Sequence, residues 1–234
     1  LATCYVEAFR NVPLLVQLFS WYFVLPELLP QSMASAFKHS DPPPPQFFSR
    51  RANSARVSTA HTLLARSAVT ACAVVGFPLG AMAPAAKVFE ATQAVADGAD
   101  EIDMVINVGW LKDGQTDAVR DEIRAIKSAI GTRVLKVIIE TCYLSDAEKV
   151  LACTLAVEAG ADYVKTSTGF GSGGATVEDV RLMLDTVQGK ALVKASGGVR
   201  DAASARQYVE MGVKRLGTSN GVKIVTGETV TGGY

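Results

Sequence analysis

Short apolar runs rich in β-branched residues alternate with helical segments of 10 to 15 residues from about Ala71 onwards. This alternation predicts strand–helix units and a parallel sheet. We expect strands at residues 72–77, 101–107, 134–141, 163–167, 191–195 and 215–219, and helices near residues 84–97, 116–129, 145–159, 176–187 and 201–211. Six parallel strands fit either a doubly wound α/β sheet or a (β/α)8 barrel, and the barrel needs two more strands from residues 1–70.

The turns between these elements carry the residues that helix ends require. Three glycines that close a helix and precede a strand are expected to be left-handed C′ caps: Gly98, Gly160 and Gly212. Three residues are expected to cap a helix N-terminus through their side chains: Ser145, Thr176 and Asp201.

The first 56 residues have a different character. They include four consecutive prolines at residues 42–45 and an aromatic, apolar stretch over residues 12–25. That stretch is shorter than the about 20 residues that span a bilayer, and prolines interrupt or bound it, so we expect no membrane anchor. We interpret residues 1–56 as an atypical N-terminal segment, residues 57–225 as the barrel and residues 226–234 as a flexible tail.

Three origins of the N-terminal segment stay open. The small residues 34–36 are weakly typical of a signal peptide, and the acid-poor composition from Met33 is typical of an organelle transit peptide. The third origin is non-native or mispredicted sequence joined to a real domain. The cysteines show no C-x-x-C spacing and suit reduced thiols, so we expect a cytoplasmic protein, or an organelle protein if a transit peptide starts at Met33.

Composition argues against several classes of function. The chain carries 23 Lys plus Arg and 23 Asp plus Glu, and a net charge of zero argues against nucleic acid or an anionic membrane as the main partner. It has two histidines, His39 and His61, so neither a multi-histidine zinc site nor a Ser-His-Asp triad is expected. We expect no metal and no other cofactor.

Three predicted strands carry a lysine at their centre: Lys136, Lys165 and Lys194. Buried parallel strands normally read as continuous apolar runs, because burying an ammonium group is costly. Side chains alternate between the two faces of a strand, so the three lysines and Asp103 converge if their faces point into a barrel. The alternative is a set of buried lysine–carboxylate pairs with a purely structural role.

Clustered amines indicate covalent chemistry. A free lysine with a pKa near 10.4 is neutral in about one molecule in a few thousand at pH 7, so it is a poor nucleophile. A second ammonium about 6 Å away contributes on the order of 3 kcal/mol of repulsion, which is roughly two pKa units, and desolvation adds to this. The activated amine can attack a carbonyl, and the Schiff base then acts as an electron sink. This is aldol chemistry without a metal.

Glycine-rich turns follow the lysine strands. They lie at residues 169–174, 197–200 and 217–221. Backbone N–H groups at such turns bind phosphate, and barrels often place this site on the loops after strands seven and eight. Together with the lysines, these turns predict a phosphorylated carbonyl substrate.

Five motifs follow one another along about residues 57–225: VVGFPLG at 74–80, EIDMVIN at 101–107, LKVIIET at 135–141, VKTSTGFG at 164–171 and VKASGGVR at 193–200. In order and spacing they resemble the deoxyribose-phosphate aldolases, a family of class I aldolases. The resemblance implies a (β/α)8 TIM barrel. It also implies a lyase that cleaves 2-deoxyribose 5-phosphate to glyceraldehyde 3-phosphate and acetaldehyde and runs the condensation as well.

The same resemblance implies roles for individual residues. Lys165 would form the Schiff base, Lys194 would lower its pKa, and Asp103 would relay protons. Lys136 is a candidate accessory residue, and Tyr234 resembles a C-terminal tyrosine that some members fold over the site. The phosphate would lie among Gly169, Gly171, Gly197, Gly198, Arg200, Gly217 and Ser219, with Asn220 where many members carry a second serine.

The chain departs from the family at its start. Members open with a strand reading Asp-His-Thr-Leu-Leu and a second reading Cys-Val-Asn-Pro. In one register, HTLL at residues 61–64 repeats part of the first motif. In the other, which the spacing to Gly76 favours, residues 57–65 form the helix after strand two and residues 52–54 replace Val-Asn-Pro. In both cases we expect the first two strands of the barrel to be degraded or replaced.

We therefore predict a metal-independent aldolase of deoxyribonucleotide catabolism. The alternatives are an inactive barrel remnant that binds phosphate esters without turnover and a related Schiff-base lyase for another phosphorylated sugar. The predicted partner is a small phosphorylated sugar, with neither nucleic acid nor membrane, and a homodimer is the oligomer that we consider.

Overall fold

The computed structural model describes residues 49–65, 69–219, 221 and 224. Seven strands in these residues form one parallel sheet in sequence order. They are β1 (Ser49–Ala52), β2 (Thr70–Val75), β3 (Glu101–Val105), β4 (Val134–Ile138), β5 (Tyr163–Lys165), β6 (Leu192–Ser196) and β7 (Arg215–Gly217). A doubly wound sheet reverses its strand order, whereas a barrel winds in one direction. The winding is therefore that of a barrel, with β1 and β7 as the edges of the described sheet.

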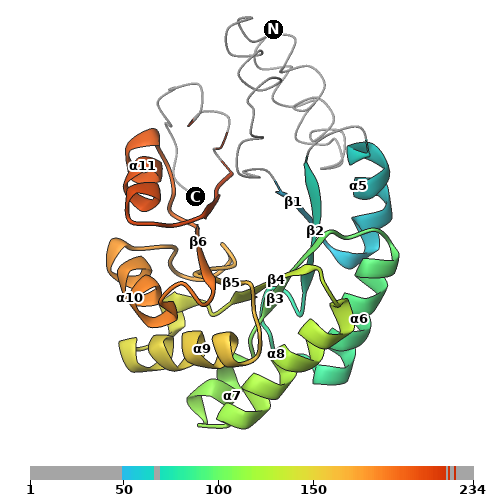
Figure 1. Cartoon of the computed structure of the whole chain (residues 1–234), viewed down its shortest axis with the longest axis horizontal. Helices are drawn as coiled ribbons and strands as arrows, with labels where there is room; N and C mark the ends of the chain where they lie inside the picture. Colours follow the sequence, from blue (N-terminus) through green and yellow to red (C-terminus); the bar gives the residue numbers. More distant parts are fainter. Residues whose placement is uncertain (1–48, 66–68, 220, 222–223, 225–234) are drawn as a thin grey trace, which may run out of the picture. The chain divides into compact units, whose positions relative to one another are not determined.

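Helices form an arc around the outside of this sheet (Figure 1). They are α5 (Val57–Leu64), α6 (Pro84–Ala96), α7 (Val108–Lys112), α8 (Thr116–Ile130), α9 (Asp146–Glu158), α10 (Val177–Val187) and α11 (Ala202–Glu210), with 3-10 turns at Ser54–Arg56 and Thr141–Tyr143. The five helices predicted from the sequence pattern are all present. The short helix α7 was not predicted. In the described part of the chain, no helix has the length and apolar character needed to cross a bilayer.

The predicted helix caps are also confirmed. Ser145 Oγ accepts from Glu148 N while the Glu148 carboxylate accepts from Ser145 N, so α9 begins with a capping box. Thr176 and Asp201 accept from the backbone of α10 and α11 in the same way. The three predicted C′ glycines have φ angles of 99°, 83° and 109°: Gly98, Gly160 and Gly212.

The start of the sheet decides between the two registers. Residues 61–64 are helical in α5, so the register that made them a strand is wrong, and the one that placed a helix at residues 57–65 is confirmed. Strand β1 pairs in parallel with β2, with Arg51 opposite Cys72. Within the described residues the sheet thus begins at Ser49, and the boundary predicted between residues 56 and 57 stays a prediction. The predictions for residues 1–48 and for the tail at 226–234 lie outside the described residues.

Alternation along the strands separates an apolar face from a polar one. Ile102 and Met104 of β3 belong to the hydrophobic core, together with residues of the covering helices such as Ile123 and Ile126 of α8. Each fully buried aliphatic side chain contributes about 1.5–3 kcal/mol to stability. Because successive side chains point to opposite faces, the same packing turns Asp103 to the interior side of the sheet.

One buried ion pair joins α6 and α8, two of the helices that cover the sheet. Lys87 Nζ of α6 lies 2.8 Å from Glu122 Oε2 of α8 and donates to the carbonyl oxygen of Val105 at 2.9 Å. Both side chains are fully enclosed. Removing one partner of such a pair typically costs about 3–5 kcal/mol, because the other charge is left buried and uncompensated. The pair therefore fixes the end of β3, two residues beyond Asp103.

Candidate active site

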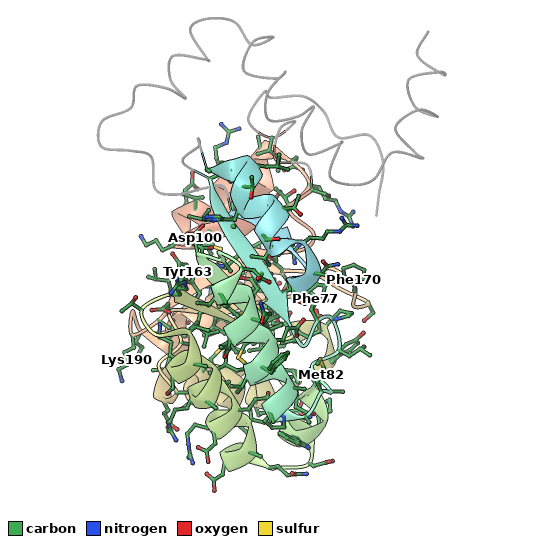
Figure 2. The ribbon with its side chains drawn as sticks, turned by 90° about the vertical axis from the view of Figure 1, so that its right-hand side faces the viewer. Phe77, Met82, Asp100, Tyr163, Phe170 and Lys190 are labelled. Atoms are coloured by element: carbon green, nitrogen blue, oxygen red, sulfur yellow. The ribbon has the colours of Figure 1, made fainter. Side chains whose placement is uncertain are left out.

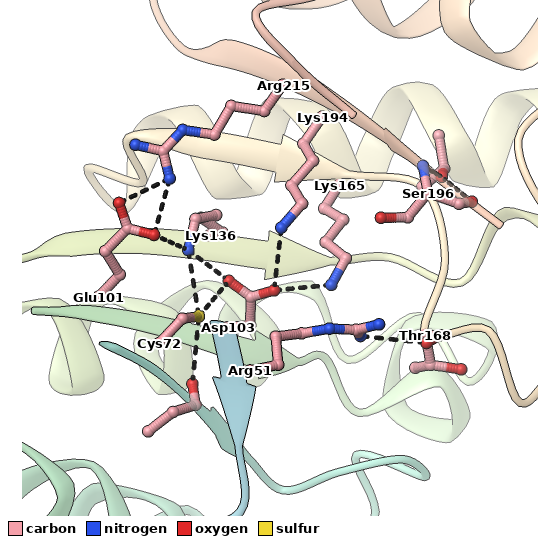
Figure 3. Close-up of polar contacts among 12 residues, drawn as sticks. Arg51, Cys72, Glu101, Asp103, Lys136, Lys165, Thr168, Lys194, Ser196 and Arg215 are labelled. Atoms are coloured by element: carbon pink, nitrogen blue, oxygen red, sulfur yellow. Dashed lines mark hydrogen bonds and ion pairs between the residues drawn. The ribbon is translucent and has the colours of Figure 1, made fainter. Parts of the chain in front are cut away.

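Four charged side chains meet on the interior face of the sheet: Asp103 of β3, Lys136 of β4, Lys165 of β5 and Lys194 of β6 (Figure 3). The strand register places Asp103 opposite Lys136, and Lys165 opposite Lys194. All four are buried. The convergence predicted from the period-two pattern is confirmed.

The two oxygens of Asp103 have different partners. Oδ1 accepts from Lys136 Nζ at 2.6 Å and from the Cys72 thiol at 3.2 Å. Oδ2 accepts from Lys165 Nζ at 2.6 Å and lies 3.6 Å from Lys194 Nζ. Burial raises the pKa of Asp103, but the surrounding ammonium groups, Lys136 first, more than offset this and hold the pKa well below its usual range. Asp103 is therefore an anion at neutral pH.

The amine of Lys165 titrates near neutrality. Its pKa is lowered from 10.5 to about 7. Burial is the largest cause, since it disfavours the charged amine; the Asp103 carboxylate opposes it, and the charges of Lys194 and Arg51 lower the pKa further. Burial thus lowers the pKa of Lys165 more than the neighbouring ammonium of Lys194 does, although the sequence pattern suggested the ammonium as the main cause. About half of the Lys165 amines are neutral at pH 7, as a nucleophile requires.

Lys194 lies on the same side of the sheet as Lys165. Both nitrogens contact Oδ2 of Asp103, so they are no further apart than the sum of 2.6 and 3.6 Å. The pKa of Lys194 is also lowered, chiefly by burial and, against the attraction of Asp103, by the charge of Lys136. The Lys194 amine therefore lies close to any molecule that binds to Lys165.

Lys136 has the opposite character although it lies on the next strand. Its three N–H groups have three acceptors: Glu101 Oε2 at 2.7 Å, Asp103 Oδ1 at 2.6 Å and Cys72 Sγ at 3.3 Å. Burial lowers the pKa of Lys136, but Asp103, Cys72 and Glu101 outweigh burial and raise the pKa above its usual range. Lys136 therefore stays an ammonium and cannot act as a nucleophile.

Glycines of the loops after β5 and β6 pack against each other, and Gly217, the last residue of β7, packs against Ser196, the last residue of β6. Gly174 packs against Gly197 so closely that a Cβ on Gly174 would lie 2.4 Å from the Gly197 carbonyl carbon. A Cβ on Gly217 would lie 2.0 Å from Ser196 Oγ. Gly197 and Gly198 have left-handed φ angles of 74° and 75°, which point to a backbone that needs glycine here. The role of these glycines in binding phosphate stays a prediction.

The other residues predicted to bind phosphate do not all lie beside these glycines. Gly169, in the loop after β5, has a φ of 89°. Gly171 lies against Cys142 and Glu140 instead of the Gly197 turn. Arg200 and Ser219 are exposed on the segments after β6 and β7. Tyr234 and Asn220 lie outside the described residues, so their predicted roles stay predictions.

The comparisons with known proteins decide the family. A model of the DeoC/LacD family aldolases matches residues 59–227. The chain belongs to this family. A deoxyribose-phosphate aldolase of Streptococcus uberis is 53% identical over 189 residues, which cover 81% of this chain and 86% of the relative. One of Brevibacillus brevis is 58% identical over 173 residues, which cover 74% and 78%.

Solved structures of the aldolases agree with the fold. A putative deoxyribose-phosphate aldolase from Coccidioides immitis superimposes with a TM-score of 0.73 at 42% identity, covering 76% of this chain and 72% of that one. The deoxyribose phosphate aldolase from Aeropyrum pernix, described as a unique tetramer, superimposes with a TM-score of 0.69 at 29% identity, covering 83% and 80%. The motifs quoted above therefore reflect membership of the aldolase family.

Arg51 is a residue at the aldolase site that sequence reasoning missed. From β1 its Nη1 donates to the carbonyl oxygen of Thr168 at 3.2 Å, and its guanidinium lies 5.8 Å from the ring centroid of Phe77. The rings of Phe77 and Phe170 meet edge to face at 5.4 Å, side by side in Figure 2. Because Arg51 falls in the segment expected to be atypical, no pattern in the sequence pointed to it.

Glu140 is a second missed residue, although the LKVIIET motif contains it. It has a left-handed φ of 55°, uncommon for a residue with a side chain. Its carboxylate accepts from Thr168 N, with both oxygens 3.2 Å away, and from the Thr168 hydroxyl. The Glu140 carboxylate, which follows β4, thus holds Thr168 and with it the loop that follows Lys165.

Proposed function

We propose that this chain is a class I aldolase that cleaves 2-deoxy-D-ribose 5-phosphate to glyceraldehyde 3-phosphate and acetaldehyde. The observation that carries the proposal is the buried Lys165 amine, which titrates near pH 7 and contacts an ionised carboxylate at 2.6 Å. A neutral amine beside a fixed anion is what imine formation and proton relay require. Membership of the aldolase family supports the same reaction.

The reaction begins when the neutral Lys165 nitrogen attacks the substrate aldehyde carbon. Loss of water gives a protonated imine, which draws the electrons of the C2–C3 bond towards nitrogen as that bond breaks. Asp103 accepts the C3 hydroxyl proton, directly or through water, and glyceraldehyde 3-phosphate leaves. The remaining enamine takes a proton at C2, and water then hydrolyses the imine to release acetaldehyde and the free amine. Lys194 stabilises the developing charges and supplies protons.

The phosphate group is held at the other end of the substrate. We assign it to the cluster formed by Ser196, Gly197, Gly198 and Gly217, in which Gly198 is exposed and follows a left-handed turn at Gly197. Arg200 lies on the adjoining turn and contributes positive charge. This arrangement selects a phosphorylated sugar, and a substrate panel that varies the sugar tests the selection.

Trapping experiments test the reaction. Sodium borohydride with acetaldehyde is expected to leave an ethyl group on Lys165, located by peptide mass spectrometry, and Lys165→Met should abolish both the label and the release of acetaldehyde from the sugar phosphate. Lys190→Met, at an exposed lysine, is the matched control and should behave as the parent chain. Absence of a label at Lys165 would overturn the proposal. A label without turnover would favour an inactive barrel remnant.

Two further proposals concern assembly and location. We propose a homodimer, which light scattering after gel filtration tests directly. We also propose a cytoplasmic location, supported by cysteines without disulfide spacing, with Cys72 and Cys153 buried as free thiols. Fractionation of cells that make the tagged full chain tests the second proposal, and import into an organelle would contradict it.

A further inference from the structure

A chain of largely buried charged side chains leads from Asp103 to β7, an edge strand of the described sheet. Arg215 Nη1 of β7 donates to both oxygens of Glu101, at 2.6 and 2.7 Å, and Glu101 Oε2 lies 2.7 Å from Lys136 Nζ (Figure 3). Lys136 in turn holds Oδ1 of Asp103. The side chains of Arg215, Glu101 and Lys136 are 11%, 2% and 0% exposed. The proposed mechanism leaves Arg215 and Glu101 without a role.

The outer end of the chain is itself fixed. The Arg215 guanidinium lies 5.0 Å from the centroid of the Tyr163 ring, which holds it by a cation–π contact. Glu101 therefore cannot turn without losing both bonds to Arg215. Since the third acceptor of Lys136 is the Cys72 sulfur, every N–H of this ammonium has a set direction.

The fixed ammonium determines which oxygen of Asp103 faces the reacting amines. Lys136 occupies Oδ1, and this leaves Oδ2 to Lys165 and Lys194. We propose that Arg215 and Glu101 are positioning residues that act through Lys136 to keep Asp103 aimed at Lys165 for proton transfer. This inference rests on the proposed function, because it assigns the chain a task in that reaction.

The substitution Glu101→Gln perturbs the chain with little change in size. The amide has one acceptor oxygen in place of two, so the guanidinium of Arg215 and the ammonium of Lys136 compete for it, while its NH2 group cannot accept from either. Lys136 then loses a partner and is free to bond Oδ2 of Asp103, where it displaces Lys165. Imine formation needs the neutral amine alone, whereas proton transfer at carbon needs the aimed carboxylate.

Two readouts on one protein separate these steps. Borohydride trapping with acetaldehyde measures imine formation at Lys165. Exchange of the acetaldehyde methyl protons in D2O, followed by NMR, measures the proton transfer that interconverts imine and enamine. In Glu101→Gln we expect exchange to fall about tenfold or more, because small misplacements of a catalytic group have effects of this size, while trapping stays within about twofold. Arg215→Lys keeps the charge and one bond to Glu101, and should retain most of the exchange.

Lys149→Met is the matched control. It breaks an ion pair of 2.6 Å with Asp179 between α9 and α10, both of whose side chains are nearly buried, outside the charge chain. The control should exchange at the parental rate. Parental exchange in Glu101→Gln, or equal losses of exchange and trapping there, would overturn the inference. If the parent chain takes no label at Lys165, the proposed function itself fails, which is a different result.

Discussion

Removing the Lys194 charge should make Lys165 a weaker nucleophile at neutral pH. Among the charged groups that lower the pKa of Lys165, Lys194 has the largest effect after burial itself. Lys194→Met removes this cation from the site. Lys165 stays buried, and the Asp103 carboxylate still favours the protonated form of Lys165. The pKa of Lys165 should therefore rise from about 7 towards, but not up to, 10.5.

The contacts with Asp103 set the size of this rise. Two unit charges about 6 Å apart, in an effective dielectric near 20, repel each other by about 3 kcal/mol, or roughly two pKa units. The distances of 2.6 and 3.6 Å to the shared oxygen keep Lys165 and Lys194 at or below this separation. A pKa near 9 would leave about one amine in a hundred neutral at pH 7, so imine trapping should slow about fifty-fold.

Trapping rates measured from pH 6 to pH 10 test the argument. The parent chain should show a midpoint near pH 7, and Lys194→Met a midpoint about two pH units higher with full recovery at high pH. Recovery also shows that the variant is folded, and Lys190→Met again serves as the matched control. If the midpoint does not move, the repulsion between the two amines has no part in activating Lys165.

Three further outcomes are expected. Arg51→Gln removes an exposed, solvent-screened cation, so the trapping midpoint should rise by less than about one pH unit in the same pH series. Ser145→Ala removes the capping box of α9 and should lower the free energy of unfolding in urea by about 1 kcal/mol without changing turnover. Lys165→Met should be more stable than the parent at pH 7, by up to about 4 kcal/mol, because the folded-state pKa of Lys165, about 7, lies below its unfolded value of 10.5. This advantage should shrink as the pH rises from 7 through 10.5, above which the parent no longer gives up a proton on folding; urea melts that show a constant difference would contradict the reasoning.

The arrangement of the site was predictable because strand periodicity fixes faces. Asp103 and the three lysines stand at alternate positions in runs whose other residues, such as Ile102 and Val137, are strongly apolar. Apolar side chains must pack under the helices, so the charged ones have to face the interior. The ends of helices were also predictable, because the residues that cap them are chosen by local backbone chemistry, as at Ser145 and Gly160.

The identities of the charge partners could not be predicted in this way. The bond from Arg215 to Glu101 joins β7 to β3, and a pattern along one strand carries no information about such a partner. Strand β1 was expected only as the remnant of a degraded strand at residues 52–54, and for a different reason. Its sequence, SRRA, carries two adjacent arginines and resembles no buried strand, and only pairing with β2 gives it a place in the sheet. Tertiary context overrides local propensity there.

Lys136 and Lys165 show what decides the chemistry of a buried amine. Both lie on interior positions of adjacent strands, both are fully enclosed, and both contact Asp103 at 2.6 Å. Lys136 has a second carboxylate at 2.7 Å and a sulfur as third acceptor, whereas Lys165 shares its carboxylate oxygen with Lys194. Desolvation acts on both, so the count of acceptors against competing cations separates a permanent ammonium from an amine that titrates near pH 7. The proposed nucleophile, Lys165, thus contacts one carboxylate where Lys136 contacts two, and a change that gave Lys165 a second carboxylate should raise its pKa and slow imine trapping at pH 7.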